Sequence, residues 1–97
     1  MQRRSESHTP TLARAEMGDS ELLLLISRRD LYALEVIYDR HIEAAWRVAL
    51  RFSKDVAAAE GAVSAAFLRL WRKPDPGDRA SLSARLLWSV RREASRA

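Results

Sequence analysis

The residues of this chain that could do chemistry are mostly arginines, and they gather toward the C-terminal end. Fifteen of the 17 cationic side chains are arginine, and residues 69–97 hold eight cationic side chains against three acidic ones. A guanidinium group suits forked contacts with phosphate and stacking on bases. A basic stretch confined to one element is typical of a surface that contacts a polyanion, and also of a solvated helix face. Charge alone therefore leaves nucleic-acid binding and a solvated face as alternatives.

A tryptophan lies within this basic stretch at helical spacing. On a helical wheel with about 100° per residue, an apolar arc is formed by Leu82, Leu86, Leu87, Val90 and Ala94. Trp88 points away from that arc. Arg85 and Arg92 flank it one turn before and one turn after, and Arg91 and Arg96 lie nearby. Such a surface fits single-stranded nucleic acid, with arginines on phosphates and the ring stacked on a base. The alternative is that Trp88 packs under the preceding loop, with the arginines as solvated cover.

The sequence shows no arrangement of residues for catalysis or for holding a metal ion. It has no cysteine and no glycine-rich phosphate loop, and His8 and His41 each lack a second ligand at helical spacing. Glu43 and Arg47, four residues apart, are typical of surface ion pairing. We therefore expect no enzymatic activity, no metal and no cofactor.

Length and composition indicate one small domain. The chain has 97 residues, of which 47% are hydrophobic and 31% charged, with a net charge of +4. This is too apolar for a fully disordered protein, and no apolar run reaches the ~20 residues that span a bilayer. There is neither a cysteine pair for a disulfide nor a signal segment at the start. We expect a cytoplasmic protein without a membrane segment.

Apolar periodicity predicts four helices. Residues 1–18 lack it, and we expect a flexible tail with no fixed structure before about Met17. The helices are expected to begin at four residues that favour the N-cap position: Asp19, Asp30, Asp55 and Ser81. Two prolines and a glycine make residues 73–78 a loop. Because no alternating β-branched run occurs, we expect an all-α, compact four-helix domain over residues 19–97.

Several segments between residues 33 and 94 carry a resemblance to a known family. They are ALEVIYDRHIEAAWRVALRF from Ala33 to Phe52, Asp55, the Ala-Glu pair at 59–60, FLRLWR from Phe67 to Arg72 and, more loosely, SLSARLLWSVRREA from Ser81 to Ala94. Together they resemble the second conserved region of bacterial extracytoplasmic-function sigma factors, the alternative subunits that direct RNA polymerase to promoters. The resemblance implies the four-helix fold of sigma region 2.

The resemblance also implies partners and site residues. The domain would dock on the clamp helices of the β′ subunit of core RNA polymerase, and would melt and read the promoter −10 element as single-stranded DNA. An anti-sigma factor would be a further partner. The docking helix corresponds to residues 55–72, which implies Glu60, Ser64 and Arg69 for polymerase binding. The next loop and helix meet DNA, which implies Lys73, Arg79, Arg85, Trp88, Arg91, Arg92 and Arg96.

The chain departs from the family pattern in the docking helix. Family members carry a pattern such as DAEDVVQEVF where this chain has AAEGAVSAAF over residues 58–67, and only Glu60 keeps a polar, partner-facing character. The loop 73–80 lacks the family's aromatic residue, and Arg85 takes the place of a usual tryptophan. The −35-reading domain is not in the sequence, so we expect either a fragment or a freestanding sigma-like protein. The alternative function is a degenerate sigma-like module that binds a protein regulator or forms a homodimer, without productive promoter recognition.

Overall fold

The computed structural model describes residues 10–96, and the four helices expected from the sequence are present. They are α2 (Asp19–Ser27), α3 (Leu31–Phe52), α4 (Val56–Arg72) and α5 (Leu82–Ala94). A further short helical segment covers residues 10–14. No strand occurs within the described range, so the predicted all-α fold is confirmed. None of the helices in this range combines the length and the apolar character that crossing a bilayer would require.

Three of the four predicted N-caps are confirmed. Side-chain oxygens of Asp30, Asp55 and Ser81 accept hydrogen bonds from backbone N–H groups in the first turns of α3, α4 and α5. The prediction for α2 is wrong, because Gly18 is its N-cap residue and Asp19 is its first helical residue. The Glu21 carboxylate accepts a hydrogen bond of 3.3 Å from the Gly18 N–H.

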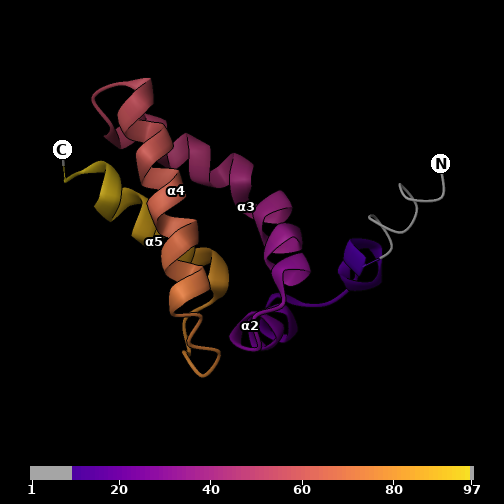
Figure 1. The fold of residues 1–97 in the computed structure, drawn as a ribbon. Coiled ribbons are helices and arrows are strands. Elements are labelled where there is room, and N and C mark those ends of the chain that lie inside the picture. The colour runs from indigo at the N-terminus through magenta and orange to yellow at the C-terminus, as the bar shows by residue number, and fades with distance from the viewer. Residues whose placement is uncertain (1–9, 97) are drawn as a thin grey trace, which may run out of the picture.

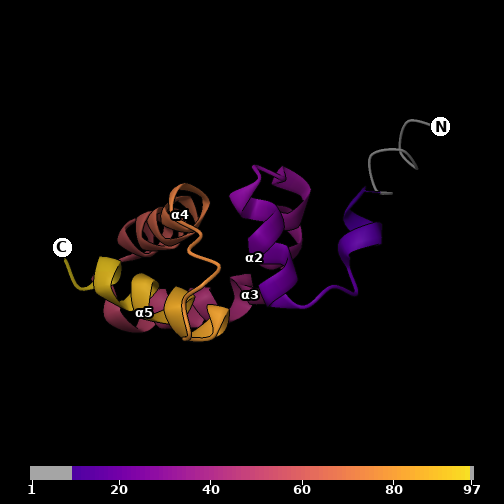
Figure 2. The same cartoon turned by 90° about the horizontal axis from the view of Figure 1, so that it is seen from below.

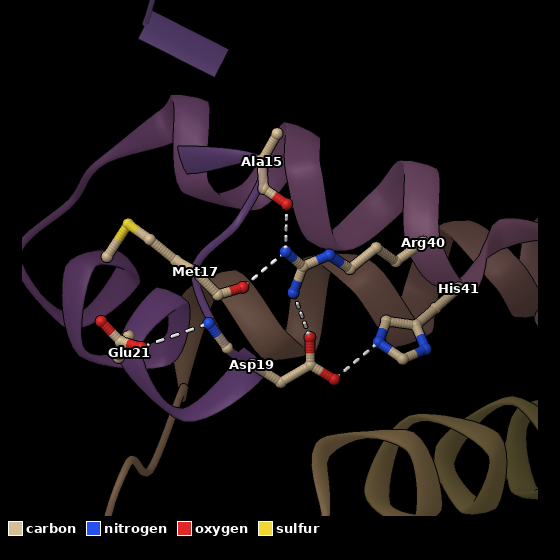
Figure 3. Close-up of polar contacts among 7 residues, drawn as sticks. Ala15, Met17, Asp19, Glu21, Arg40 and His41 are labelled. Carbon is tan, nitrogen blue, oxygen red and sulfur yellow. Dashed lines mark hydrogen bonds and ion pairs between the residues drawn. The ribbon is translucent and has the colours of Figure 1, made fainter. Parts of the chain in front are cut away.

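The Asp19 carboxylate is used for a long-range contact instead (Figure 3). One of its oxygens accepts a hydrogen bond of 3.0 Å from Arg40, and the other lies 2.9 Å from Nε2 of His41. Both partners belong to α3 and lie 21 and 22 residues further along the chain. A carboxylate engaged by two side chains of another helix is not free to cap its own helix.

Residues 10–17, expected to lack fixed structure, are held against this same corner of the fold. Arg40 also donates to the backbone carbonyl oxygens of Ala15 and Met17 (Figure 3). Arg14 forms an ion pair of 2.7 Å with Asp30. These polar contacts hold the segment in place. Apolar periodicity does not detect the segment, because such contacts leave no apolar pattern in the sequence. Residues 1–9 of the expected tail lie outside the described residues.

The long helix α3 organises the molecule (Figures 1 and 2). Helix α2 packs against α3 at one end, and α4 and α5 lie side by side against α3 at the other. Apolar side chains from all four helices meet between them to form one core. Its buried members include Leu22, Ile26, Ile37, Ala45, Ala49, Val63, Phe67, Leu70, Leu86 and Val90. In α5 the buried positions Leu82, Leu86, Val90 and Ala94 are four of the five predicted from the wheel, and Leu87 is half-buried.

A contact at the end of α2 connects it to α4. Helix α2 closes with hydrogen bonds from the N–H of Arg29 to the carbonyl of Ile26 and from the N–H of Asp30 to the carbonyl of Leu25. This turn places Arg29 at φ 65°, a conformation that usually favours glycine. The Arg29 guanidinium lies 5.1 Å from the centroid of the Trp71 ring and donates to the Trp71 carbonyl oxygen. The last turn of α4 is therefore fixed from outside just before the loop that follows it.

Candidate nucleic-acid interface

A groove of about 330 Å³ lies between the C-terminal part of α4, the loop that follows and α5. Its walls bring together most of the residues that the sequence analysis assigned to DNA. Its polar and aromatic lining residues are Arg69, Lys73, Asp75, Asp78, Arg85, Trp88, Ser89, Arg92, Glu93 and Arg96. The floor is apolar, with Ala66, Leu70 and Leu86. A basic groove with an apolar floor and one aromatic wall can accommodate a base and its flanking phosphates.

The cations of the groove fall into two groups. Arg85 lies 3.4 Å from the Asp78 carboxylate, and Arg96 lies 3.3 Å from Glu93. Arg69, Lys73 and Arg92 form no ion pair with any residue in the range 10–96. Their charges are therefore available to a ligand, and phosphate is the anion that a row of such groups suits best.

Trp88 is the aromatic residue among those that line the groove. Trp88 is 63% exposed, which contradicts the alternative that it packs under the preceding loop. An exposed indole ring keeps apolar surface in contact with water and does not contribute to the core. It is available to stack on a flat ligand, and every nucleobase presents such a face.

Arg85 has a different environment from the other arginines of α5. Its side chain is only 15% exposed. It donates hydrogen bonds of 2.7 Å to the carbonyl oxygen of Pro74 and 3.2 Å to that of Asp75. Arg85 is thus engaged by the loop rather than directed at solvent.

Two residues predicted to contact DNA do not line the groove. Arg91 lies over the Phe52 ring of α3, with 4.8 Å between the guanidinium carbon and the ring centroid. Arg79 is exposed in the loop and is not part of the groove wall. Both therefore remain predictions without support from the groove geometry.

The residues predicted for polymerase docking separate onto two sides of α4. Glu60 and Ser64 are exposed and lie one turn apart on the outer face of the helix. Arg69, nine residues after Glu60, lies about 180° away around the helix and lines the groove. Arg69 was not placed in the groove by the sequence analysis. The spacing of four residues between Arg69 and Lys73 could have indicated it, because residues four apart share a helix face.

Comparisons with known proteins show the family to which the chain belongs. Residues 37–97 match the family model described as sigma-70 region 2. The chain belongs to the sigma-70 family. The match begins within α3 and includes α4, the loop and α5, so both the groove and the outer face of α4 lie inside sigma-70 region 2.

Individual relatives indicate which type of sigma factor the chain resembles. Over 60 residues the chain is 38% identical to a protein named ECF RNA polymerase sigma factor SigL, from the Erdman, CDC 1551 and H37Rv strains of Mycobacterium tuberculosis. The matched stretch is 61% of this chain and 34% of the relative, so the region 2 likeness spans about a third of that protein. No solved structure gives a significant match to the chain. The resemblance to region 2 of an extracytoplasmic-function sigma factor is confirmed.

Proposed function

We propose that this region 2 domain acts in transcription initiation by binding core RNA polymerase and holding the promoter −10 element as single-stranded DNA. The observation that carries the proposal is the groove of α4, the loop and α5, in which an exposed Trp88 lies among three cations that have no ion-pair partner within residues 10–96. A sigma factor working in this way is a non-catalytic, cytoplasmic initiation factor.

The groove favours a single strand over a duplex for a steric reason. Stacking on Trp88 requires an open base face, and bases in a duplex present their faces to one another. The groove is too small for a helix of nucleic acid but large enough for one base with its neighbouring phosphates. Lys73, at the end of α4, and Arg92, on α5, would hold those phosphates.

Polymerase docking is proposed for the outer face of α4, through Glu60 and Ser64. Both side chains are exposed, and Glu60 forms no ion pair within residues 10–96. The neighbouring outer positions are Ala57 and Gly61, which are also exposed and small. Such a face allows close approach of a partner helix, with Glu60 available for a charge-assisted contact.

The experiment is a pull-down of the chain with purified core RNA polymerase. The proposal expects the native chain to bind, Glu60→Arg to lose binding and Glu43→Arg to keep it. Glu43 is a matched control because its side chain is 85% exposed on α3 and, within the described range, pairs with the exposed Arg47 alone. Failure of the native chain to bind, or equal binding by Glu60→Arg, would contradict polymerase docking through this face.

The small residues of the outer face favour a second candidate function, a sigma-like module that packs on a protein regulator or on a second copy. A Cβ added at Gly61 would meet no atom within 4 Å, so this face is open. The two candidate functions predict different results in the pull-down when four residues of α4 are changed to the family's Asp, Asp, Gln and Glu. These residues are Ala58, Gly61, Ser64 and Ala65. Polymerase binding by the changed chain alone would favour the interaction module. Sedimentation of the native chain would then distinguish a monomer from a homodimer, and an anti-sigma factor would be sought for the monomer.

A further inference from the structure

We infer that Arg85 is a positioning residue that fixes the loop of residues 73–80 as one wall of the groove and does not itself contact DNA. The effect on DNA rests on the proposed function, whereas the effect on the loop does not. Arg85 was expected at the DNA because it shares a helix face with Trp88 and Arg92. The contacts of its guanidinium group give it another role.

The Arg85 guanidinium reaches three groups of the loop at once. Its Nη2 donates to the carbonyl oxygen of Pro74 at 2.7 Å, and its Nη1 donates to that of Asp75 at 3.2 Å. Its Nε lies 3.4 Å from the Asp78 carboxylate. The two carbonyl bonds span adjacent residues, and the ion pair fixes the far side of the turn. The planar, multi-donor shape of arginine suits such a set of acceptors, whereas the point charge of lysine does not.

Besides Arg85, the burial of Pro74 and hydrogen bonds within the loop hold it in place. Its own hydrogen bonds run from the N–H of Asp78 to the carbonyl of Asp75, at 3.0 Å, and from the N–H of Ala80 to the Asp78 side chain, at 2.9 Å. Asp75 adopts φ 45°, which an L-residue rarely does without support. Arg85 also donates to the Asp75 carbonyl oxygen, and it pairs with the other oxygen of the Asp78 carboxylate, so loss of Arg85 would loosen the turn.

Arg85 also changes the charge that the groove presents to a ligand. Asp78 lines the groove, and an unpaired carboxylate there would repel a phosphate. Its ion pair with Arg85 places a positive charge beside it. Arg85 is among the lining residues of the groove, but its guanidinium is engaged by the loop, and it favours the ligand by offsetting the charge of Asp78.

The experiment compares Arg85→Lys with the control Arg47→Lys, since the Arg47 side chain is 76% exposed on α3 and lies outside the groove. Amide hydrogen exchange measured by NMR reports on the loop at Asp78 and Ala80, and on the core at Ile37. Fluorescence anisotropy with a labelled single-stranded oligonucleotide reports on binding. In the native chain, the hydrogen-exchange rate of the Arg85 guanidinium protons is also measured by NMR.

We expect Arg85→Lys to speed exchange at Asp78 and Ala80 about tenfold or more, with Ile37 unchanged, and to weaken oligonucleotide binding about tenfold. Arg47→Lys keeps its charge at an exposed position outside the groove, so we expect native exchange rates and affinity within about twofold. In the native chain the Arg85 guanidinium protons should exchange slowly, a result that does not depend on how any variant folds.

Two results would overturn the inference. One is native loop exchange in Arg85→Lys, and the other is rapid exchange of the native Arg85 guanidinium protons. If the native chain bound no oligonucleotide while the exchange results came out as expected, the proposed DNA function would fail and the positioning of the loop by Arg85 would stand.

Discussion

The Arg91 guanidinium lies over the Phe52 ring, 4.8 Å from its centroid, and this contact joins the end of α5 to the end of α3. Adjacent arginines of α5 therefore face different surroundings, because Arg92 lines the groove and Arg91 does not. A cation over an aromatic face contributes about 0.5–1 kcal/mol at an exposed site. Arg91 is thus placed to stabilise the helix packing.

This placement predicts different outcomes for two neighbouring substitutions. Arg91→Ala should lower the free energy of unfolding by about 0.5–1 kcal/mol and leave single-strand affinity unchanged. Arg92→Ala should weaken single-strand affinity and leave the free energy of unfolding unchanged, because Arg92 is solvent-exposed and is proposed to contact a phosphate. Urea unfolding and anisotropy titrations measure both quantities. A loss of affinity in Arg91→Ala equal to that in Arg92→Ala would show that the groove is not the binding surface.

Arg40 should hold residues 10–17 in place. Arg40→Ala removes its hydrogen bonds to the Asp19 carboxylate and to the carbonyl oxygens of Ala15 and Met17. We expect a loss of about 1–2 kcal/mol in unfolding free energy and faster tryptic cleavage after Arg14. Arg47→Ala is the control, since Arg47 is 76% exposed and pairs with an exposed Glu43 on the same helix. Its cost should stay below about 0.5 kcal/mol. Equal cleavage rates in both variants would contradict the role of Arg40.

Gly61 should limit the stability of α4. It lies within the helix at an exposed position, and a Cβ there would meet no atom within 4 Å. Gly61→Ala should therefore raise the free energy of unfolding by about 0.5–1 kcal/mol in urea titrations. The reverse change on the same face, Ser64→Gly, should lower it by about 0.5 kcal/mol. A destabilised Gly61→Ala would mean that this face is covered by another chain in solution.

Much of the fold was predictable because it depends on local chemistry. Apolar spacing identified the buried face of α5, and short polar side chains at Asp30, Asp55 and Ser81 marked three helix starts. The N-cap of α2 was wrong because Asp19 interacts with residues that follow more than 20 positions later. The contacts of Arg40 with residues 10–17 are equally non-local, and no periodic pattern records them.

The candidate site was predictable in part for the same reason. The helical wheel correctly separated Trp88 from the apolar face of α5, because side-chain direction follows from helix geometry. It could not separate Arg85 from Arg92, since both lie near Trp88 on the wheel. That difference arises from the path of the loop, whose prolines and strained Asp75 set where its carbonyl oxygens point. The wheel likewise gave no sign that Phe52 would lie beside Arg91.

The measurement that tests the central claim most directly is the affinity of native chain and Trp88→Ala for a labelled single-stranded oligonucleotide, alongside their unfolding free energies. Leu68→Ala is the control, because Leu68 is another exposed large apolar side chain, on α4 and outside the groove. If Trp88 stacks on a base, Trp88→Ala should weaken binding by about 1–3 kcal/mol, roughly 5- to 150-fold, with stability within about 0.5 kcal/mol of native. Leu68→Ala should bind like the native chain. Native affinity in Trp88→Ala together with a large loss of stability would contradict the account and assign Trp88 to packing.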